Sequence, residues 1–144
     1  MKCHGTNAIS GETVEIAFND PGTGGLISHV DSLLNPAGDE PFVSPGFIDL
    51  QVNGFAGVDY CSPAAPLPEI ARSIRAMFAT GVTRFFPTVI TGSPDNMAGA
   101  LANLAKARRT LPEGAAIEAF HAEGPFISPE DGPRGAHPQR WVRP

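Results

Sequence analysis

The segment His121-Ala-Glu123-Gly-Pro-Phe126 decides the fold that we expect for this chain of 144 residues. It closes an apolar run over residues 115–120 and opens a loop rich in glycine and proline, which leads to Gly135-Ala-His137-Pro138. A carboxylate at the end of a buried strand, close to histidines, is typical of a divalent-cation site at the mouth of a barrel. Glu123 is therefore a candidate metal ligand, and a glutamate ion-paired at the strand end is an equally open alternative.

Upstream of this segment, the chain alternates between strand and helix patterns. Strands are expected over residues 47–52, 82–90 and 115–121, and Pro87 predicts a late start or a bulge in the second of them. Apolar residues at helical spacing predict a first helix through Leu67, Ile70, Ile74, Met77 and Phe78, with Gly81 after its end. Ser93-Pro94 is a typical start for a second helix, which continues through Arg108. This alternation predicts a parallel sheet with right-handed connections.

The expected fold class is α/β, and the length of the chain limits how much of a barrel it holds. A complete (β/α)8 TIM barrel takes about 250 residues. Residues 44–144 therefore correspond to about three βα units, the N-terminal portion of such a barrel with strands 1–3. Residues 1–43 are predicted to form a small N-terminal β segment in front of it.

Within the small β segment, residues 13–18 alternate so that Val14, Ile16 and Phe18 are expected on one face of a strand. Residues 19–25 are typical of a long turn, and residues 26–30 of a returning strand.

Composition excludes several classes of function. The formal net charge is −5 and the chain shows no basic face, so no nucleic-acid partner is expected. No run approaches the roughly 20 apolar residues of a transmembrane helix, and residues 1–7 contain no apolar signal-peptide core, so we expect no membrane association and a cytoplasmic location. Cys3 and Cys61 are expected to be reduced thiols.

Polar residues at the ends of the expected strands are the remaining candidates for a site. Strand alternation puts His121 and Glu123 on one side, where His121 either holds Glu123 by a hydrogen bond or is a core histidine. The first strand ends in Gln51-Val-Asn53, and neutral amides are poor ligands for a borderline cation, which argues against a second metal. The alternative for Gln51 and Asn53 is that both amides cap the strand end. Asp49 is given a structural role.

The loop after residue 126 carries His137 and three arginines. From the residues alone, His137 is best explained as a solvent-exposed loop histidine, and Arg134, Arg140 and Arg143 as solvated side chains rather than phosphate ligands.

Two motifs together resemble a known family. Pro45-Gly-Phe-Ile-Asp49-Leu-Gln51-Val-Asn53-Gly54 and His121-Ala-Glu123-Gly-Pro resemble the amidohydrolase superfamily, and within it the N-acetylglucosamine-6-phosphate deacetylases. The resemblance covers residues 44–138, most densely 44–60, 84–91 and 119–138. It implies a metal-dependent-hydrolase barrel that hydrolyses the N-acetyl amide of N-acetyl-D-glucosamine 6-phosphate to glucosamine 6-phosphate and acetate, in amino-sugar catabolism.

The resemblance also implies roles for individual residues. Glu123 would bind one divalent metal ion, zinc or ferrous iron, and His137 would contact and polarise the N-acetyl carbonyl beside Ala136. Gln51, Asn53 and His121 would surround this site without binding the metal. The partner would be a small-molecule amino-sugar phosphate, and the complete enzyme would be a homo-oligomer.

The family also uses two further metal histidines and a catalytic aspartate, which lie downstream of the residues present here. We therefore expect the 144-residue chain to be inactive by itself. Two alternatives stay open: a non-catalytic truncated remnant or interaction module, and an amidohydrolase that acts on another N-acyl substrate.

Overall fold

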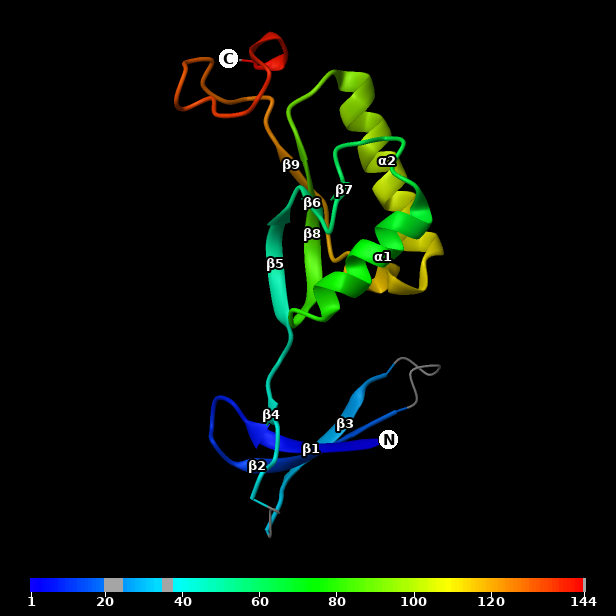
Figure 1. Ribbon diagram of the computed structural model, residues 1–144, viewed down its shortest axis with the longest axis vertical. Helices are drawn as coiled ribbons and strands as arrows, with labels where there is room; N and C mark the ends of the chain where they lie inside the picture. Colours follow the sequence, from blue (N-terminus) through cyan, green and yellow to red (C-terminus); the bar gives the residue numbers. More distant parts are fainter. Residues whose placement is uncertain (20–24, 35–37, 144) are drawn as a thin grey trace. The chain divides into compact units, whose positions relative to one another are not determined.

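The computed structural model describes residues 1–19, 25–34 and 38–143 and divides the chain into two compact units, Met1–Pro45 and Gly46–Pro144 (Figure 1). The turn that the sequence predicts over residues 19–25 lies largely outside the described residues. Among the described residues, no helix is both long and apolar enough to cross a membrane.

The first unit is a four-stranded sheet in the order β3-β2-β1-β4. Its strands are β1 (Lys2–Asn7), β2 (Thr13–Phe18), β3 (Ile27–Ser32) and β4 (Phe42–Val43). β1 and β3 pair antiparallel with β2, and β4 pairs parallel with β1. The strand expected over residues 13–18 is confirmed, and the returning strand lies one to two residues later than expected.

The side-chain alternation expected along β2 is wrong at its end. Val14 and Ala17 are the buried residues, whereas Ile16 and Phe18 are half-buried. The register between β2 and β3 shifts between Ala17 and Phe18. The shift leaves Ser28 on β3 without a partner on β2, so the ladder is irregular where the alternation along β2 is lost.

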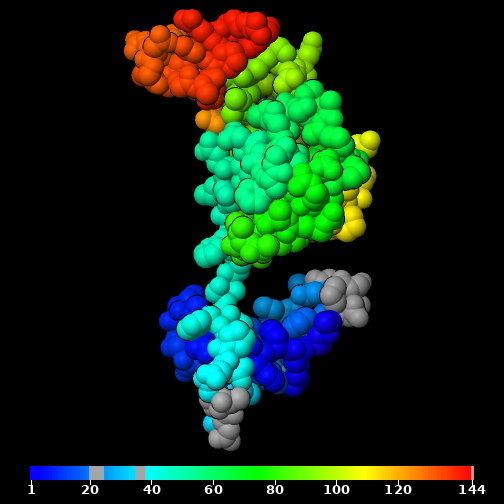
Figure 2. All heavy atoms as spheres, in the orientation of Figure 1, coloured from blue at the N-terminus to red at the C-terminus, as the bar shows by residue number. Residues whose placement is uncertain are grey.

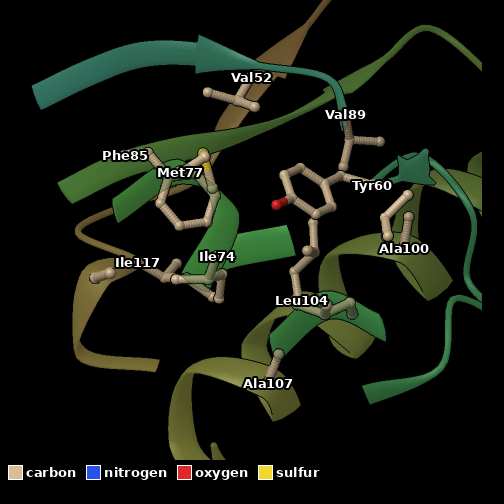
Figure 3. Close-up of a cluster of buried hydrophobic side chains, with 13 residues drawn as sticks. Val52, Tyr60, Ile74, Met77, Phe85, Val89, Ala100, Leu104, Ala107 and Ile117 are labelled. Atoms are coloured by element: carbon tan, nitrogen blue, oxygen red, sulfur yellow. The ribbon is translucent and has the colours of Figure 1, made fainter. Parts of the chain in front are cut away.

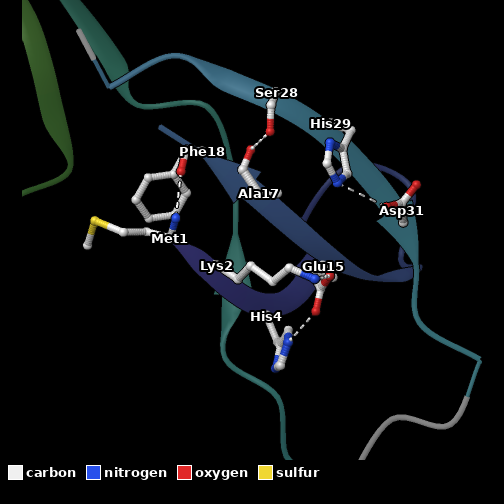
Figure 4. A network of polar contacts seen from close by, with 9 residues as sticks. All are labelled: Met1, Lys2, His4, Glu15, Ala17, Phe18, Ser28, His29 and Asp31. Atoms are coloured by element: carbon white, nitrogen blue, oxygen red, sulfur yellow. Dashed lines mark hydrogen bonds and ion pairs between the residues drawn. The ribbon is translucent and has the colours of Figure 1, made fainter. Parts of the chain in front are cut away.

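Charged side chains of β1 and β2 contact one another (Figure 4). Lys2 Nζ donates to Glu15 Oε1 at 2.5 Å, and His4 Nε2 lies 3.1 Å from Glu15 Oε2. The hydrogen bond from Lys2 lowers the pKa of the Glu15 carboxyl, and Glu15 raises the pKa of Lys2. All three side chains face solvent, where ion pairs contribute little to stability.

The second unit is built on a parallel sheet in the order β5-β8-β9. The strands are β5 (Phe47–Val52), β8 (Val82–Ile90) and β9 (His121–Glu123), and a short hairpin, β6 (Gly54–Phe55) with β7 (Val58–Asp59), follows β5. Helices α1 (Leu67–Phe78) and α2 (Pro94–Thr110) connect the strands, followed by the 3-10 helices η2 (Pro112–Ala116) and η3 (Gln139–Trp141). The α/β class and the first two strands and both helices of this unit are as predicted.

The third strand is shorter and later than predicted. Residues 115 and 116 belong to η2, Ile117 makes an isolated bridge to Phe85, and the ladder resumes only at β9. Gly114 explains the early part, because a Cβ at this position would lie 2.3 Å from the carbonyl oxygen of Arg108. The chain therefore folds tightly against the end of α2 before it can extend.

Local signals for the ends of the helices are accurate. Ser93 Oγ accepts a hydrogen bond from the backbone nitrogen of Asn96 and so caps α2. Gly81 adopts a φ of +86° between α1 and β8, a conformation that favours glycine. The late start that Pro87 allowed for β8 is not seen, since the strand begins at Val82. Pro87 pairs with Val52, and the β5–β8 register is irregular between Asp49 and Val52.

Both helices cover one side of this sheet and form the core with it (Figure 3). α1 contributes Ile74, which is fully buried, and α2 contributes Leu104. Tyr60 lies between them, with its hydroxyl 2.6 Å from Ser73 Oγ and its ring centroid 5.8 Å from that of Phe85. Burial raises the pKa of Tyr60. The Tyr60–Ser73 hydrogen bond thus satisfies a polar pair inside an otherwise apolar cluster.

β5 keeps large apolar side chains on its surface. Phe47 is 66% exposed, Ile48 44% and Leu50 62%. In the described residues, β5 pairs along one edge only, with β8. A parallel strand with an open edge and uncovered apolar side chains is unusual, since parallel sheets are normally covered on both faces.

Candidate functional site

The carboxyl ends of β5, β8 and β9 and the loop after β9 surround a pocket of about 490 Å³. Its lining is mostly polar or small: Gln51, Asn53, Ile90, Glu123, Ile127, Pro133, Arg134, Gly135, Ala136 and His137. In parallel α/β sheets this end is where ligands bind, because loops from neighbouring strands converge there. Five of the six site residues predicted from the sequence line this pocket.

Glu123, at the end of β9, is held by both of its carboxylate oxygens. Oε2 accepts a hydrogen bond from Gln51 Nε2 at 2.9 Å, and Oε1 lies 3.3 Å from His137 Nε2. The side chain is 32% exposed. In the described part of the chain, its ionisable partner within 4 Å is His137, so the ion-pair alternative would require a protonated imidazole.

His137 is not the exposed loop histidine that the residues alone suggest, because its side chain is only 13% exposed. Its Nδ1 lies 2.9 Å from Thr91 Oγ1, and its backbone carbonyl accepts a hydrogen bond from Arg134 Nη1 at 2.8 Å. Contacts to Glu123, Thr91 and Arg134 therefore place the imidazole against the pocket wall.

His121 does not hold Glu123. Its Nδ1 lies 3.2 Å from the backbone oxygen of Leu50, so it contacts β5 rather than the carboxylate. In the ladder, His121 pairs with Thr88 on β8, two residues before the pair of Glu123 with Ile90.

Asn53 and Ala136 both line the pocket, and in the described residues no hydrogen bond joins the Asn53 side chain to Glu123 or His137. The backbone oxygen of Asn53 accepts from the nitrogen of Tyr60 at 2.9 Å, which fits a role in ending the strand. Asp49 Oδ1 accepts from the nitrogen of Gln51 at 3.1 Å, in keeping with the structural role predicted for it.

Two residues of this region make contacts that the sequence did not indicate. Thr91, the residue after β8, is 2% exposed and contacts His137. Arg134 is 20% exposed instead of solvated, since its guanidinium bonds Asp131 as well as the carbonyl of His137. The feature of the sequence that could have indicated Thr91 is its position directly after β8. Asn53 similarly follows β5, and Glu123 is the last residue of β9.

The side chains of this pocket supply too few ligands for the metal ion that the motifs imply. Within the described ranges, no three histidine, cysteine or acidic side chains gather in a way that could hold a metal ion. Glu123 and His137 form a pair, whereas catalytic zinc usually has three protein ligands. These residues therefore do not complete a metal site, and Glu123 can be at most one member of it.

A second pocket of about 490 Å³ lies beside the start of α2, where the end of the chain packs (Figure 2). Asn96, Cys61 and Arg140 are among its lining residues. Cys61 is half-buried, burial raises the pKa of its thiol, and its Sγ lies 3.5 Å from the nitrogen of Ile90. These contacts give Cys61 a packing role.

The fold and the pocket around Glu123 define an α/β protein with a polar site at the carboxyl ends of parallel strands. Solved structures with the same fold exist. The N-acetylglucosamine-6-phosphate deacetylase from Thermotoga maritima aligns with 100% of this chain and 37% of its own, at a TM-score of 0.71 and 25% identity. A mutant of the Mycobacterium smegmatis enzyme, in complex with N-acetyl-D-glucosamine-6-phosphate, aligns with 91% of this chain and 32% of its own, at 0.66 and 25%. No family model matches the chain.

Curated relatives carry the same name. The proteins named N-acetylglucosamine-6-phosphate deacetylase from Caenorhabditis elegans, Mus musculus and Bacillus subtilis are 42%, 38% and 34% identical over 104, 102 and 103 residues. These matches cover 69–70% of this chain, and 24–25% of the relatives. The resemblance predicted from the motifs is thereby confirmed: the chain is homologous to the N-acetylglucosamine-6-phosphate deacetylases. It spans about a quarter of the length of the curated relatives that it matches.

Proposed function

We propose that this chain forms part of a metal-dependent N-acetylglucosamine-6-phosphate deacetylase, which releases acetate from N-acetyl-D-glucosamine 6-phosphate and leaves glucosamine 6-phosphate. The observation that carries the proposal is the meeting of Gln51, Glu123 and His137 in one pocket. The relatives supply the substrate class, since they are named for this reaction.

We also propose that the β5-β8-β9 sheet is the N-terminal portion of a (β/α)8 barrel. Three parallel strands joined by helices on one side are three units of such a barrel. The exposed Phe47, Ile48 and Leu50 on β5 support this, because further barrel elements would cover them. In this proposal the remaining strands belong to residues beyond the 144 present here.

In the reaction, His137 would act on the substrate carbonyl. Its Nε2 contacts Glu123 Oε1 at the pocket wall, and with substrate bound this N–H would donate instead to the amide oxygen, which gains negative charge as the carbonyl is attacked. Ala136 precedes it with a side chain small enough to leave room for an acetyl group. Gln51 would keep Glu123 in place, because it binds Oε2 while Oε1 contacts His137.

The metal belongs to the proposal as well. Glu123 would supply one ligand to a single zinc or ferrous ion, and Gln51 and Asn53 are amides, which disfavours a second ion. When bound, such an ion lowers the pKa of a coordinated water and polarises a carbonyl. The remaining ligands and the general base would come from the rest of the barrel. We further propose a cytoplasmic homo-oligomer that acts on a small amino-sugar phosphate.

The test compares substitutions of two glutamates, made in the full-length protein that contains this chain. Glu123→Gln should lower acetate release and bound metal together, by at least about tenfold, since even groups that only support a ligand contribute that much. Glu118→Gln is the matched control, because Glu118 pairs with Arg84 outside the pocket. Wild-type metal content and activity in Glu123→Gln would refute the assignment.

The alternative is a non-catalytic remnant, favoured for the isolated chain by its incomplete donor set. Residues 1–144 alone, supplied with zinc or ferrous iron, should then release no acetate above a Glu123→Ala control. A panel of other N-acyl sugars distinguishes the third possibility, a related amidohydrolase with another substrate. Better turnover of an unphosphorylated or differently acylated sugar would establish that possibility.

A further inference from the structure

Thr91 is the most deeply buried polar residue in contact with the site. It is 2% exposed and directly follows β8. Its Oγ1 lies 2.9 Å from His137 Nδ1 and 3.3 Å from the backbone oxygen of Glu123. A single hydroxyl thus contacts the two segments that carry the proposed functional residues.

The chemistry of these contacts defines where the hydrogens lie when His137 is neutral. A carboxylate only accepts hydrogen bonds, so the Nε2 atom that lies 3.3 Å from Glu123 Oε1 carries the ring hydrogen. Nδ1 is then an acceptor, and the single hydrogen of the Thr91 hydroxyl goes to this nitrogen at 2.9 Å rather than to the backbone oxygen of Glu123 at 3.3 Å. Thr91 therefore binds the nitrogen that faces away from the pocket and keeps the N–H on the nitrogen that faces into it.

The lack of a side chain at Gly124 leaves room for the contact between Thr91 and His137. A Cβ at residue 124 would lie 2.0 Å from Thr91 Oγ1 and 3.7 Å from His137 Nδ1, and the residue has a φ of +82°. Only a glycine leaves the space that the hydroxyl occupies. Sequence positions 91, 124 and 137 are thus matched to one another sterically.

We propose that Thr91 is a positioning residue, which fixes the ring orientation and the tautomer of His137 so that Nε2–H points into the pocket. The contribution of Thr91 to catalysis rests on the proposed function, because the Nε2–H of His137 is the group that would donate to the substrate carbonyl. The structural part rests only on the contacts among Thr91, His137 and Glu123.

The first experiment reads the tautomer directly and does not need activity. The chain has four histidines, so ¹⁵N-histidine labelling with His137→Gln for assignment gives a simple spectrum. With a chelator present, the neutral imidazole of His137 should show the Nε2–H form. Thr91→Val should shift it towards a mixture of both tautomers, and Thr91→Ser should restore the wild-type signals.

Thr88→Val is the matched control for a lost buried hydroxyl. Thr88 Oγ1 accepts from the nitrogen of Val52 and does not contact His137, so this variant should leave the His137 signals unchanged. The His121 signals report whether each variant is folded at the site end. If His137 keeps the wild-type tautomer in a folded Thr91→Val protein, the positioning role is wrong.

The second experiment uses acetate release by the gene product that carries this chain. Thr91→Val should lower kcat about three- to tenfold, the effect of one hydrogen bond, with KM nearly unchanged, and Thr91→Ser should recover most of it. Equal losses in Thr91→Val and Thr88→Val would mean a merely structural effect and overturn the proposal. Absence of acetate release in the wild type would instead refute the proposed function and leave the tautomer result standing.

Discussion

The helix-covered side of the β5-β8-β9 sheet and the pocket at its carboxyl end are held together by different forces. On the covered side, Ile74, Phe85 and Leu104 are almost completely buried among other apolar side chains. At the pocket, Glu123 and His137 depend on a few directional contacts and remain partly open to solvent. The first arrangement tolerates approximate shapes, whereas the second fails if one partner is lost.

The difference teaches that stability and proposed chemistry are carried by separate residues of the same small sheet. Apolar burial contributes in proportion to the area removed from water and has no preferred direction. A hydrogen bond such as Gln51–Glu123 adds little to stability but fixes an angle and a distance. Variants on the two sides should therefore separate loss of folding from loss of function.

The largest effect is expected from Ile74→Ala on the covered side. The residue is fully buried in α1, so the substitution should lower the free energy of unfolding by about 2–5 kcal/mol. Denaturant unfolding of the 144-residue chain measures this change. Leu50→Ala is its control, because Leu50 is 62% exposed and should cost less than about 0.5 kcal/mol. A Leu50→Ala cost of several kcal/mol in this chain would contradict the open face described for β5.

The next effect is expected from Gly124→Ala beside the pocket. The new Cβ would collide with Thr91 Oγ1, and the left-handed backbone adds about 1–2 kcal/mol of strain. Stability should fall by at least that amount, and the His137 ¹⁵N signals should change as they do in Thr91→Val. Gly132→Ala also has a positive φ but nothing within 4 Å of its Cβ, so it should show the strain without the change at His137.

Ser93→Ala tests a local contact away from both regions. Loss of the bond from Asn96 should cost about 1 kcal/mol of unfolding free energy, as for other helix caps. Thermal unfolding followed by circular dichroism checks this value. His137 signals that move in this variant would show that the start of α2 and the pocket are coupled, and the separation drawn above would not hold.

The smallest effect is expected from Glu15→Gln in the first unit. Because Lys2 lowers the pKa of Glu15 in the folded state, the pair stabilises above the unfolded carboxyl pKa, and its effect is lost as the pH falls through the lowered value. The variant should thus differ slightly from wild type at neutral pH and not in strong acid. Salt should reduce the difference, since both groups face solvent. A difference that grows on acidification would reverse the sign and refute this account.

Local patterns of the sequence determined most of the second unit. Apolar runs predicted β5 and β8, and apolar spacing and the Ser93-Pro94 start predicted α1 and α2. The two helices and β8 bury residues in one core, to which β5 adds Val52. The motif around Glu123 and the Gln51-Val-Asn53 segment predicted the family resemblance, which the curated relatives confirm. The same patterns failed over residues 115–121, because the first two residues of the apolar run belong to η2.

Only the tertiary structure decided which polar side chains meet. Gln51 and Glu123 are 72 residues apart in sequence, and Thr91 and His137 are 46 apart, so no local periodicity records their contacts. The same holds for Arg134, which the loop composition made a solvated residue and which the fold turned onto the carbonyl of His137. The sequence thus determined the strands and the residues at their ends. Their partners followed from parallel pairing, which brings the carboxyl ends of distant strands to one edge.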